Sequence, residues 1–534
     1  MAQTHFIGID VGTGSARAGV FDTAGTMLAS AKHDIMLFQA PGDIAEQSSE
    51  DIWQAVSKAV RSAVRQSGVD PASIGGIGMD ATCSLVVVGA GGAPLPVGDA
   101  PERDIIVWMD HRATDQAARI NATRHAVLDY VGGTISPEME TPKLLWLKEK
   151  RPETFRAAWQ FFDLVDYLTW RATGSLARSI CTLTCKWTYL GHEGRWDSSF
   201  FEAVGLEEFP GEGFDRIGTE VVPAGTGLGS GLSANAGADF GLPAGVPVGA
   251  GLIDAHAGGL GTVGARGAQG TVLSRLAYVF GTSACTMAST QKPAFVPGVW
   301  GPYFSSMVPG LWLNEGGQSA AGAAMEQLVH HHPASGEAGQ LAASQQLSLL
   351  GWLAQEAERR GGAMALPELV GGIHVVPEFL GNRSPLADPD ARALIAGLGM
   401  DVGVESLVGL YLAGLAGLGY GTRQILKAQA AQGIGIDTIV VSGGAAQSPL
   451  VRQVLADATG VAVAATKAEE PVLLGAAMLG ALAGRHFADA AEAMTAMSEL
   501  GTIYQPNAAL SAWHAQRAEA FELLQGAARA IRRP

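Results

Sequence analysis

The sequence predicts an α/β fold made of two related domains with a cleft between them. Three observations support this prediction. At 534 residues the chain is too long for one ordinary domain. Near its start, at residues 6–22, two apolar β-type runs enclose a turn of Gly, Thr and Ser, and the same order returns at residues 276–287. After each copy, helical patterns alternate with short apolar strands. We therefore expect an N-terminal domain at residues 1–264 and a C-terminal domain at residues 265–534.

The composition argues against several classes of protein. Hydrophobic residues make up 47% of the chain and charged residues 16%, which indicates a globular protein with a large core. The net charge of −16 argues against a nucleic-acid partner. The four cysteines are too few for a disulfide scaffold, and only Cys181 and Cys185 are close in sequence. The start has no secretory leader pattern and no run has the length that a bilayer needs, so we expect a cytoplasmic protein without a membrane partner.

The first hairpin has the residue types that suit a nucleotide phosphate with its magnesium ion. Asp10 stands at the end of the first strand. The turn residues are Gly12, Thr13, Gly14 and Ser15. Small side chains let backbone N–H groups approach an anion, while the carboxylate can hold water bound to the metal. A hairpin turn without any ligand would have a similar sequence, but a second copy favours phosphate binding. The turn of that copy consists of Gly281, Thr282 and Ser283.

A helix and a pair of strands follow the first hairpin. Residues 48–67 carry apolar side chains at i+4 spacing, with serines that can cap the helix and Gly68 at its end. Residues 74–88 then have the pattern of a strand, a polar centre and a second strand. The polar centre contains Asp80, Thr82, Cys83 and Ser84. Polar groups at the end of a buried strand are placed to meet a ligand, although a polar β-turn would have the same composition.

Two further segments of the first half place charged residues next to apolar ones. In VWMDHR, residues 107–112, a buried Asp110 would need a partner such as the hydroxyls of a polyol or ketose. Alternatively, Asp110 and Arg112 form a surface ion pair. In CTLTCKW, residues 181–187, Lys186 adjoins an apolar patch and would point into a cleft or out to water.

The first half ends with the segment PAGVPVGAGLIDAHAGGLG, residues 243–261. A valine-rich strand is expected to lead to Asp254, which precedes a run of small residues. A carboxylate at such a strand-to-helix corner can act as general base on a hydroxyl group. An N-terminal helix cap without any chemistry would have the same pattern. We interpret His256 as structural, or as a neighbour of that site, and not as a metal ligand.

The second half contains two isolated polar residues before a helix, a long surface-like segment, and a loop with one arginine. Glu315 and Gln318 precede a helix start made of small residues. Residues 330–366 have a helical, surface-like pattern. The three histidines at 330–332 are interpreted as a solvated loop and not as a metal site, because adjacent side chains point in different directions. Arg383 lies in a loop of turn-forming residues.

Residues 436–460 have the pattern of a strand, the segment SGGAAQSPL and a helix. Small residues after the strand would leave a flat shelf for a purine, and the following helix N-terminus would direct amides at an anion. The shelf positions are Gly443, Gly444 and Ala445. A helix of small residues at 471–482 can pack closely, and a closing helix at 507–531 is expected to be a cover without chemistry.

This set of motifs resembles the FGGY carbohydrate kinases, which have the actin-like, ribonuclease H-like ATPase fold. The resemblance covers nearly the whole chain, from GIDVGTGSARAGVFD through GTSACT and SGGAAQSPLVRQVLADATG to EEPVLLGAAMLGA. Within the family the chain is most similar to pentulose kinases of the ribulokinase type, through GMDATCSLVVV, WMDHRA, CTLTCKW and FLGNRSPLADPDARA. Xylulokinases usually carry Gln-Met-His-Gly where this chain has Asp-Ala-Thr-Cys at residues 80–83, which argues against xylulose.

The resemblance implies roles for the matching positions. Asp10 would hold Mg²⁺ through water, and Thr13 would line the first phosphate loop. Asp254 would be the catalytic base beside the sugar. Two pairs of residues would bind the nucleotide: Gly281 and Thr282 at the phosphates, and Gly443 and Gly444 at the adenosine. The sugar would be contacted by Thr82, Cys83, Asp110, Lys186 and Glu315.

The activity that the resemblance implies is transfer of the γ-phosphoryl group of ATP to the terminal hydroxyl of a pentulose, with D-ribulose as the first choice. A kinase for ribitol or L-ribulose is the alternative within the family. An actin-like assembly or chaperone-type ATPase is the alternative from another class. The segment WMDHR, Lys186 and Asp254 argue against it, because assembly needs no sugar cleft. A Rossmann dehydrogenase fits less well, because the Gly-rich turn lies inside a hairpin and not between strand and helix. A homodimer is the assembly that the family suggests.

Overall fold

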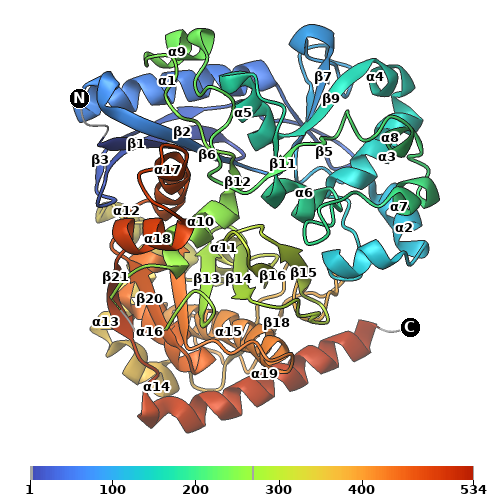
Figure 1. Cartoon of the computed structure of the whole chain (residues 1–534). Helices are drawn as coiled ribbons and strands as arrows, with labels where there is room; N and C mark the ends of the chain where they lie inside the picture. The colour runs from blue at the N-terminus through green and yellow to red at the C-terminus, as the bar shows by residue number, and fades with distance from the viewer. Residues whose placement is uncertain (1–3, 268–269, 533–534) are drawn as a thin grey trace.

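The computed structural model describes residues 4–267 and 270–532, apart from the side chains of Ala445 and Ala446. Figure 1 shows the N-terminal half above and the C-terminal half below, each built on a β-sheet with helices around it. The first sheet has the strand order β12-β6-β1-β2-β3. Its strands are β1 (His5–Val11), β2 (Ser15–Asp22), β3 (Met27–Asp34), β6 (Ile74–Ala81) and β12 (Leu252–Ile253).

The large sheet of the C-terminal half repeats the arrangement of the first. Its strand order is β15-β16-β14-β13-β19-β20-β21. In both sheets an antiparallel hairpin, β1–β2 or β13–β14, pairs through its first strand with a parallel strand, β6 or β19. The predicted fold of two related α/β units is therefore confirmed. The strands are β13 (Arg275–Phe280), β14 (Ala284–Thr290), β15 (Trp300–Phe304), β16 (Trp312–Gln318), β19 (Thr438–Gly443), β20 (Ala462–Thr466) and β21 (Leu500–Tyr504).

Helix α1 (Ser49–Ser67) forms where the sequence predicts it. The Ser48 side chain accepts a hydrogen bond from the backbone N–H of Asp51, and Gly68 ends the helix at a φ of 69°. The apolar face, which includes Ile52 and Val56, is buried. It packs against β2 and β3, so the i+4 pattern of the sequence corresponds to the core-facing side of the helix.

A third sheet, of order β4-β5-β8-β7-β9, extends the N-terminal half. The polar segment 82–84 redirects the chain, so the two strands predicted within 74–88 belong to different sheets. The strands are β4 (Phe38–Ala40), β5 (Ile44–Gln47), β7 (Leu85–Gly89), β8 (Ile105–Ile106) and β9 (Ala158–Asp163), with a small pair β10 (Arg178–Ser179) and β11 (Val221–Val222) nearby. The other helices of this half are α2 (Thr114–Ala122), α3 (Glu140–Lys150), α4 (Pro152–Ala157), α5 (Leu164–Thr173), α6 (Ile180–Lys186), α7 (Ser198–Ala203), α8 (Glu208–Gly211) and α9 (Ala234–Phe240), the last of which packs on α1 and α5.

Helices α10 (Asp254–Val263) and α17 (Pro471–Ala483) join the two halves. Although α17 belongs to the last part of the chain, it packs against β1, β6 and α10, as its position beside the first sheet in Figure 1 shows. A Cβ atom on Gly475 would lie 2.0 Å from the carbonyl oxygen of Ala257, so only glycine allows this approach. The close packing predicted for the small-residue helix is confirmed, and buried apolar residues of both halves form one continuous core around it.

Helix α15 (Val404–Ala430) corrects the expectation that no run has the length that a bilayer needs. By length and composition it could cross a membrane, and within the described ranges it is the helix that meets both criteria. However, 83% of its most apolar stretch of 18 residues is buried, because the helix packs at the centre of the C-terminal half. The remaining elements of this half are α11 (Gly322–His330), α12 (Ser335–Ser344), α13 (Leu349–Arg359), α14 (Leu366–Val370), β17 (His374–Val376), β18 (Leu394–Ala396), α16 (Pro449–Thr459), α18 (Ala490–Met497) and α19 (Ser511–Arg532).

The strand predicted before Asp254 is much shorter than expected. The valine-rich segment makes an isolated bridge between Ile77 and Val248, and only the two residues of β12 extend the ladder. The ladder breaks between these two points, because the backbone N–H and C=O groups of Ala250 bond to Thr226 and Gly225 at 2.8 Å. The corner at Asp254 nevertheless forms, because α10 begins at that residue.

Candidate functional site

Three parallel strands of the first sheet bring carboxylates to the same edge. In the register of the sheet Asp10 lies beside Asp80, and Asp80 lies beside Leu252. Asp254 follows this last strand as the first residue of α10. The carboxyl ends of parallel strands meet at one edge of a sheet, which is where α/β proteins bind ligands. The structure therefore places Asp10 and Asp254, both predicted site residues, next to the buried Asp80.

These three carboxylates share a negatively charged environment, in which Asp10 and Asp80 are buried and Asp254 is half-buried where it lines a cavity. Asp80 is fully buried, and no hydrogen-bond donor of the described residues reaches its side-chain oxygens. Burial, followed by the charges of Asp10 and Asp254, raises the pKa of Asp80 well above its ordinary value. Burial and the charge of Asp10 also raise the pKa of Asp254 to about 6. Asp10 pairs with Arg17, which forms a second ion pair with Glu470 at 2.9 Å.

Both predicted phosphate turns face one cavity of about 320 Å³. Each turn is closed by a backbone hydrogen bond, of 3.0 Å in the first and 2.9 Å in the second. The hydroxyl of Thr13 also accepts a hydrogen bond from the indole N–H of Trp108 at 3.0 Å, which ties the first turn to the neighbouring segment. The turn residues that line the cavity are Gly12, Thr13, Gly281, Thr282 and Ser283. Gly14 and Ser15, which were also predicted to bind, lie outside this lining.

The same cavity receives predicted sugar-binding residues from both halves of the chain. Thr82, Cys83 and Lys186 line it from the N-terminal half, and Glu315 lines it from β16. The amino group of Lys186 lies 5.6 Å from the centre of the Trp300 ring. These side chains share the cavity with Asp254. The structure thus joins the sugar-site candidates to the candidate base, although more than 200 residues separate the first from the last.

Glu315 is the negative centre of a group of cations. The Nε2 atom of His256 lies 3.4 Å from a carboxylate oxygen of Glu315, and its Nδ1 atom lies 3.0 Å from the carbonyl oxygen of Ser306. Burial alone would raise the pKa of Glu315. The hydrogen bond from His256 and the charges of Lys186 and Arg383 outweigh burial and lower this pKa to about 2. A buried site with fixed donors and acceptors suits a hydroxylated molecule, because each hydroxyl both donates and accepts.

A second cavity, of about 660 Å³, adjoins the first at Gly281. Gly443 ends β19 at a φ of 79°, and a Cβ atom there would lie 2.3 Å from the carbonyl oxygen of Phe280, so the chain requires glycine. Gly444 lines the cavity. Ala445 lies in the short 3₁₀ helix Gly444–Gln447, and its side chain is outside the described part of the structure. The volume and the largely apolar walls are those of a pocket for a small organic ligand.

One wall of this second cavity comes from a segment that the sequence assigned to the surface. Residues 347–358, which include all but the last residue of α13, face the glycine-rich shelf across the cavity. The lining residues of this segment are Leu347, Ser348, Leu350, Gly351, Ala354, Gln355 and Glu358. An amphipathic helix that packs on a core has the same pattern as one that borders a pocket, so the sequence held no signal for this wall.

Several residues that line the first cavity were missed as site residues. Glu138 and Trp300 come from two loop-flanked segments without a recognisable motif, and Cys285 follows the second phosphate turn. Arg383 lines the cavity as well. It is the one basic residue of the segment 377–390, which is rich in turn formers and acids, and this isolation was a signal that could have identified it.

Asp110 is the predicted sugar contact that the structure does not place in the cavity. Its carboxylate accepts a hydrogen bond from the backbone N–H of Ala45 at 2.7 Å and pairs with Arg112 at 2.7 Å. Arg112 also pairs with Glu46 at 2.9 Å. Both members of the Asp110–Arg112 pair are buried, so the alternative of a surface ion pair also needs correction. All nearby donors are directed at the carboxylate from within the protein, which leaves no place for a sugar hydroxyl.

Replacing Asp110 by Asn is therefore expected to change stability and not substrate affinity. The substitution leaves the buried guanidinium of Arg112 with one carboxylate partner fewer, which costs about 3 kcal/mol of unfolding free energy. Denaturant unfolding measures this loss, and steady-state kinetics measures the KM for the sugar. A large rise in KM with unchanged stability would return Asp110 to the sugar site.

The described residues contain no group of three or more His, Cys, Asp and Glu side chains arranged to hold a metal ion. His330, the last residue of α11, and His331 are exposed, whereas His332 is half-buried and its Nε2 atom lies 3.0 Å from the hydroxyl oxygen of Ser406. A magnesium ion that accompanies a nucleotide needs only one or two carboxylates, because phosphate oxygens and water supply the other ligands. Asp10, together with the buried Asp80 that no donor reaches, fits that requirement. The adjoining cavities likewise fit a nucleotide whose phosphates pass Gly281.

Comparison with known proteins agrees with this geometry. A model of the N-terminal domain of the FGGY family of carbohydrate kinases matches residues 5–261, and a model of its C-terminal domain matches residues 276–484. An FGGY carbohydrate kinase domain-containing protein of Homo sapiens is 45% identical over 515 residues, which is 94% of this chain and 93% of the relative. A protein of Saccharomyces cerevisiae named D-ribulokinase is 38% identical over 516 residues, which is 90% of this chain and 72% of the relative.

The fold is also similar to solved structures. A xylulose kinase from Rhodospirillum rubrum superposes with a TM-score of 0.80 over 99% of both chains, at 22% sequence identity. At this identity the likeness concerns the fold, and it matches the two-unit architecture built on the repeated hairpins.

Proposed function

This chain belongs to the FGGY family of carbohydrate kinases, and we propose that it phosphorylates the terminal hydroxyl of a pentulose, D-ribulose, with ATP. The single observation that carries the proposal is the meeting of Asp254, both phosphate turns, Lys186 and Glu315 in one cavity. The choice of ribulose is supported by the relative named D-ribulokinase and by a relative of Mycolicibacterium smegmatis named ribulokinase, which is 30% identical over 527 residues.

Asp254 acts in this proposal as the general base. Its carboxylate accepts the proton of the sugar hydroxyl while the new O–P bond forms and the bond between the γ-phosphorus and the ADP oxygen breaks. The electrons of the broken bond leave with ADP. Positioning and electrostatic stabilisation contribute most of the rate in such a transfer. A base with a pKa near neutrality is suited to the task, since it is ionised at pH 7 and still accepts a proton readily.

The other cavity residues bind and orient the two substrates. The N–H groups of Gly12 and Gly281 close the two turns. Backbone N–H groups further along each turn, at Thr13 and Thr282, would meet the phosphates, where small side chains permit close approach. Lys186 donates to sugar hydroxyls and Glu315 accepts from them. Magnesium, held by Asp10 through water, would neutralise charge on the phosphates. The adenosine lies between Gly444 and the wall of residues 347–358.

We further propose that residues 1–264 form one domain, with the sugar site and the first phosphate turn, and that residues 265–534 form the second, with the adenosine site. Closure of the two around the substrates would exclude water and so limit hydrolysis of ATP. We also propose a cytoplasmic location and a homodimeric assembly, as the family suggests.

The test is the rate of ADP release with ATP, Mg²⁺ and each of D-ribulose, L-ribulose, D-xylulose, ribitol and glycerol. We expect the highest kcat/KM with D-ribulose, and formation of the 5-phosphate measured by mass spectrometry and NMR. A higher kcat/KM with ribitol or L-ribulose would show that the substrate is that compound, while the proposed reaction, phosphoryl transfer from ATP, would stand. ATP consumption that no sugar or polyol changes would instead favour an assembly or chaperone-type ATPase.

A further inference from the structure

Arg383 reaches the sugar cavity from a loop between β17 and β18. Its guanidinium carbon lies 5.2 Å from the centre of the Trp300 ring, and one of its nitrogens lies 3.7 Å from the sulfur of Cys285. Its charge also contributes to the low pKa of Glu315. The side chain is therefore a part of the cavity wall, and its position depends on the loop that carries it.

Hydrogen bonds of Asn382, the residue directly before Arg383, stabilise the conformation of this loop. The backbone N–H of Asn382 donates to the carbonyl oxygen of Asp388 at 2.8 Å, and the N–H of Asp388 donates back at 2.9 Å. The side-chain oxygen of Asn382 accepts from the backbone N–H of Leu386 at 3.0 Å, and its side-chain amide donates to Glu378 at 2.5 Å. Every polar group of Asn382 thus holds the loop in one shape.

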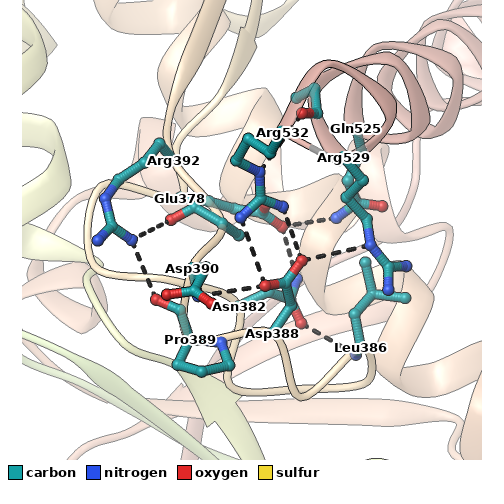
Figure 2. A network of polar contacts seen from close by, with 12 residues as sticks. Glu378, Asn382, Leu386, Asp388, Pro389, Asp390, Arg392, Gln525, Arg529 and Arg532 are labelled. Atoms are coloured by element: carbon teal, nitrogen blue, oxygen red, sulfur yellow. Dashed lines mark hydrogen bonds and ion pairs between the residues drawn. The ribbon is translucent and has the colours of Figure 1, made fainter. Parts of the chain in front are cut away.

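The C-terminal end of helix α19 forms hydrogen bonds and ion pairs with this loop, as Figure 2 shows. Arg532 donates to the carboxylate of Asp388 at 2.7 Å, and Arg529 pairs with the same carboxylate at 3.3 Å. One turn earlier, Gln525 donates at 2.5 Å to the Glu378 oxygen that also accepts from Asn382. Two lines of contact from α19, through Asp388 and through Glu378, therefore converge on Asn382.

We propose that the C-terminal end of α19 is a positioning element of the sugar site: Gln525, Arg529 and Arg532 hold the loop that presents Arg383 to the sugar. This inference rests on the proposed function, because it takes the cavity at Arg383 as the sugar site. It assigns a role to a helix that the sequence suggested as a cover without chemistry. Arg529 and Arg532 do not line the cavity and act only through Arg383.

The expected effect is moderate, because both arginines are partly exposed. Their side chains are 39% and 28% exposed. Exposed ion pairs contribute roughly 0.2–1 kcal/mol each, and salt screens them. Loss of both pairs is therefore expected to raise the KM for the sugar about three- to tenfold, while kcat changes less than twofold and the KM for ATP stays the same.

The experiment compares the double variant Arg529→Gln/Arg532→Gln with Glu522→Gln. Glu522 forms an ion pair of the same exposed kind between α19 and α15, with Lys427 at 2.8 Å, but it does not contact the loop. Hydrogen exchange of residues 378–392 reports the loop, and the sugar KM and the sugar affinity, read from Trp fluorescence, report the site. We expect faster exchange and weaker sugar binding in the double variant and neither change in Glu522→Gln.

The decisive readout is non-additivity with Arg383→Gln. If α19 acts through Arg383, the double substitution has no further effect on the sugar KM once Arg383 is replaced. Full additivity, or an unchanged sugar KM despite faster loop exchange, overturns the positioning role and leaves the proposed function intact. If the wild-type protein neither binds nor phosphorylates any pentulose or pentitol, both the proposed function and the positioning role of α19 are wrong. The two failures are therefore distinguishable.

Discussion

Replacing Asp254 by Asn is expected to lower kcat about a thousandfold while the affinity for ATP stays nearly unchanged. The amide has the size of the carboxylate but cannot accept the proton of the sugar hydroxyl. The variant should remain folded, because burial raises the pKa of Asp254 to about 6 and the ionised group is therefore unfavourable to the fold at pH 7. Turnover is measured by coupled ADP release, and nucleotide affinity by calorimetry.

The matched control for this variant is Asp115→Asn, which changes an exposed aspartate in the first turn of α2. It removes the same helix-terminal charge outside the cavity and should leave kcat unchanged. In the wild-type protein, kcat should fall as the pH drops through about 6, because protonation removes the base. Full turnover of Asp254→Asn, or a kcat that is flat from pH 5 to 8, would exclude Asp254 as the base.

Replacing Glu315 by Gln is expected to lower kcat/KM about a hundredfold, mainly through a higher KM for the sugar. The substitution removes the buried anion that Lys186 and Arg383 face. The hydrogen bond from His256 to Glu315, at 3.4 Å, also loses its charged acceptor. Of the two groups that raise the pKa of His256, Cys185 and Glu315, only Cys185 then remains. The cations then lose their common partner, and the sugar loses a charged acceptor.

A buried glutamate elsewhere provides the control for Glu315→Gln. Glu356 has a side chain only 6% exposed and pairs with Arg360 at 2.9 Å, but it does not line the sugar cavity. Glu356→Gln should reduce the free energy of unfolding without raising the sugar KM. Equal sugar KM values for Glu315→Gln and the wild type would show that Glu315 has a structural role only.

The fold could be predicted from the sequence because the patterns that indicate its elements lie within short stretches of the chain. The apolar runs on both sides of Gly12 and Gly281 are continuous in the chain, and so is the capped i+4 pattern of α1. The corner at Asp254 needs only a strand end followed by small residues. Such patterns report a backbone conformation within about 20 residues, and the repeat of the hairpin then indicates two related units.

Site residues were predicted where a motif also marks a strand end, as at Thr82, and missed where only packing brings a side chain to the cavity. Glu138 and Trp300 come from opposite halves of the chain and have no common local pattern. Asp110 was predicted as a site residue from its motif, but its carboxylate pairs with Arg112 and does not face the cavity. A side chain's direction in a loop depends on partners far away in sequence.

Local patterns in the chain were thus enough to predict the two hairpin-based units, the strand ends that carry Asp10 and Asp254, and the small-residue helix α17. Long-range packing was needed to show which charges share the first cavity, which segment closes the second cavity, and that α19 reaches the loop of Arg383. Hydrogen-bonded helices and hairpins form from residues that are neighbours in the sequence. Cavities and ion-pair networks are made by surfaces that meet only when the whole chain has packed.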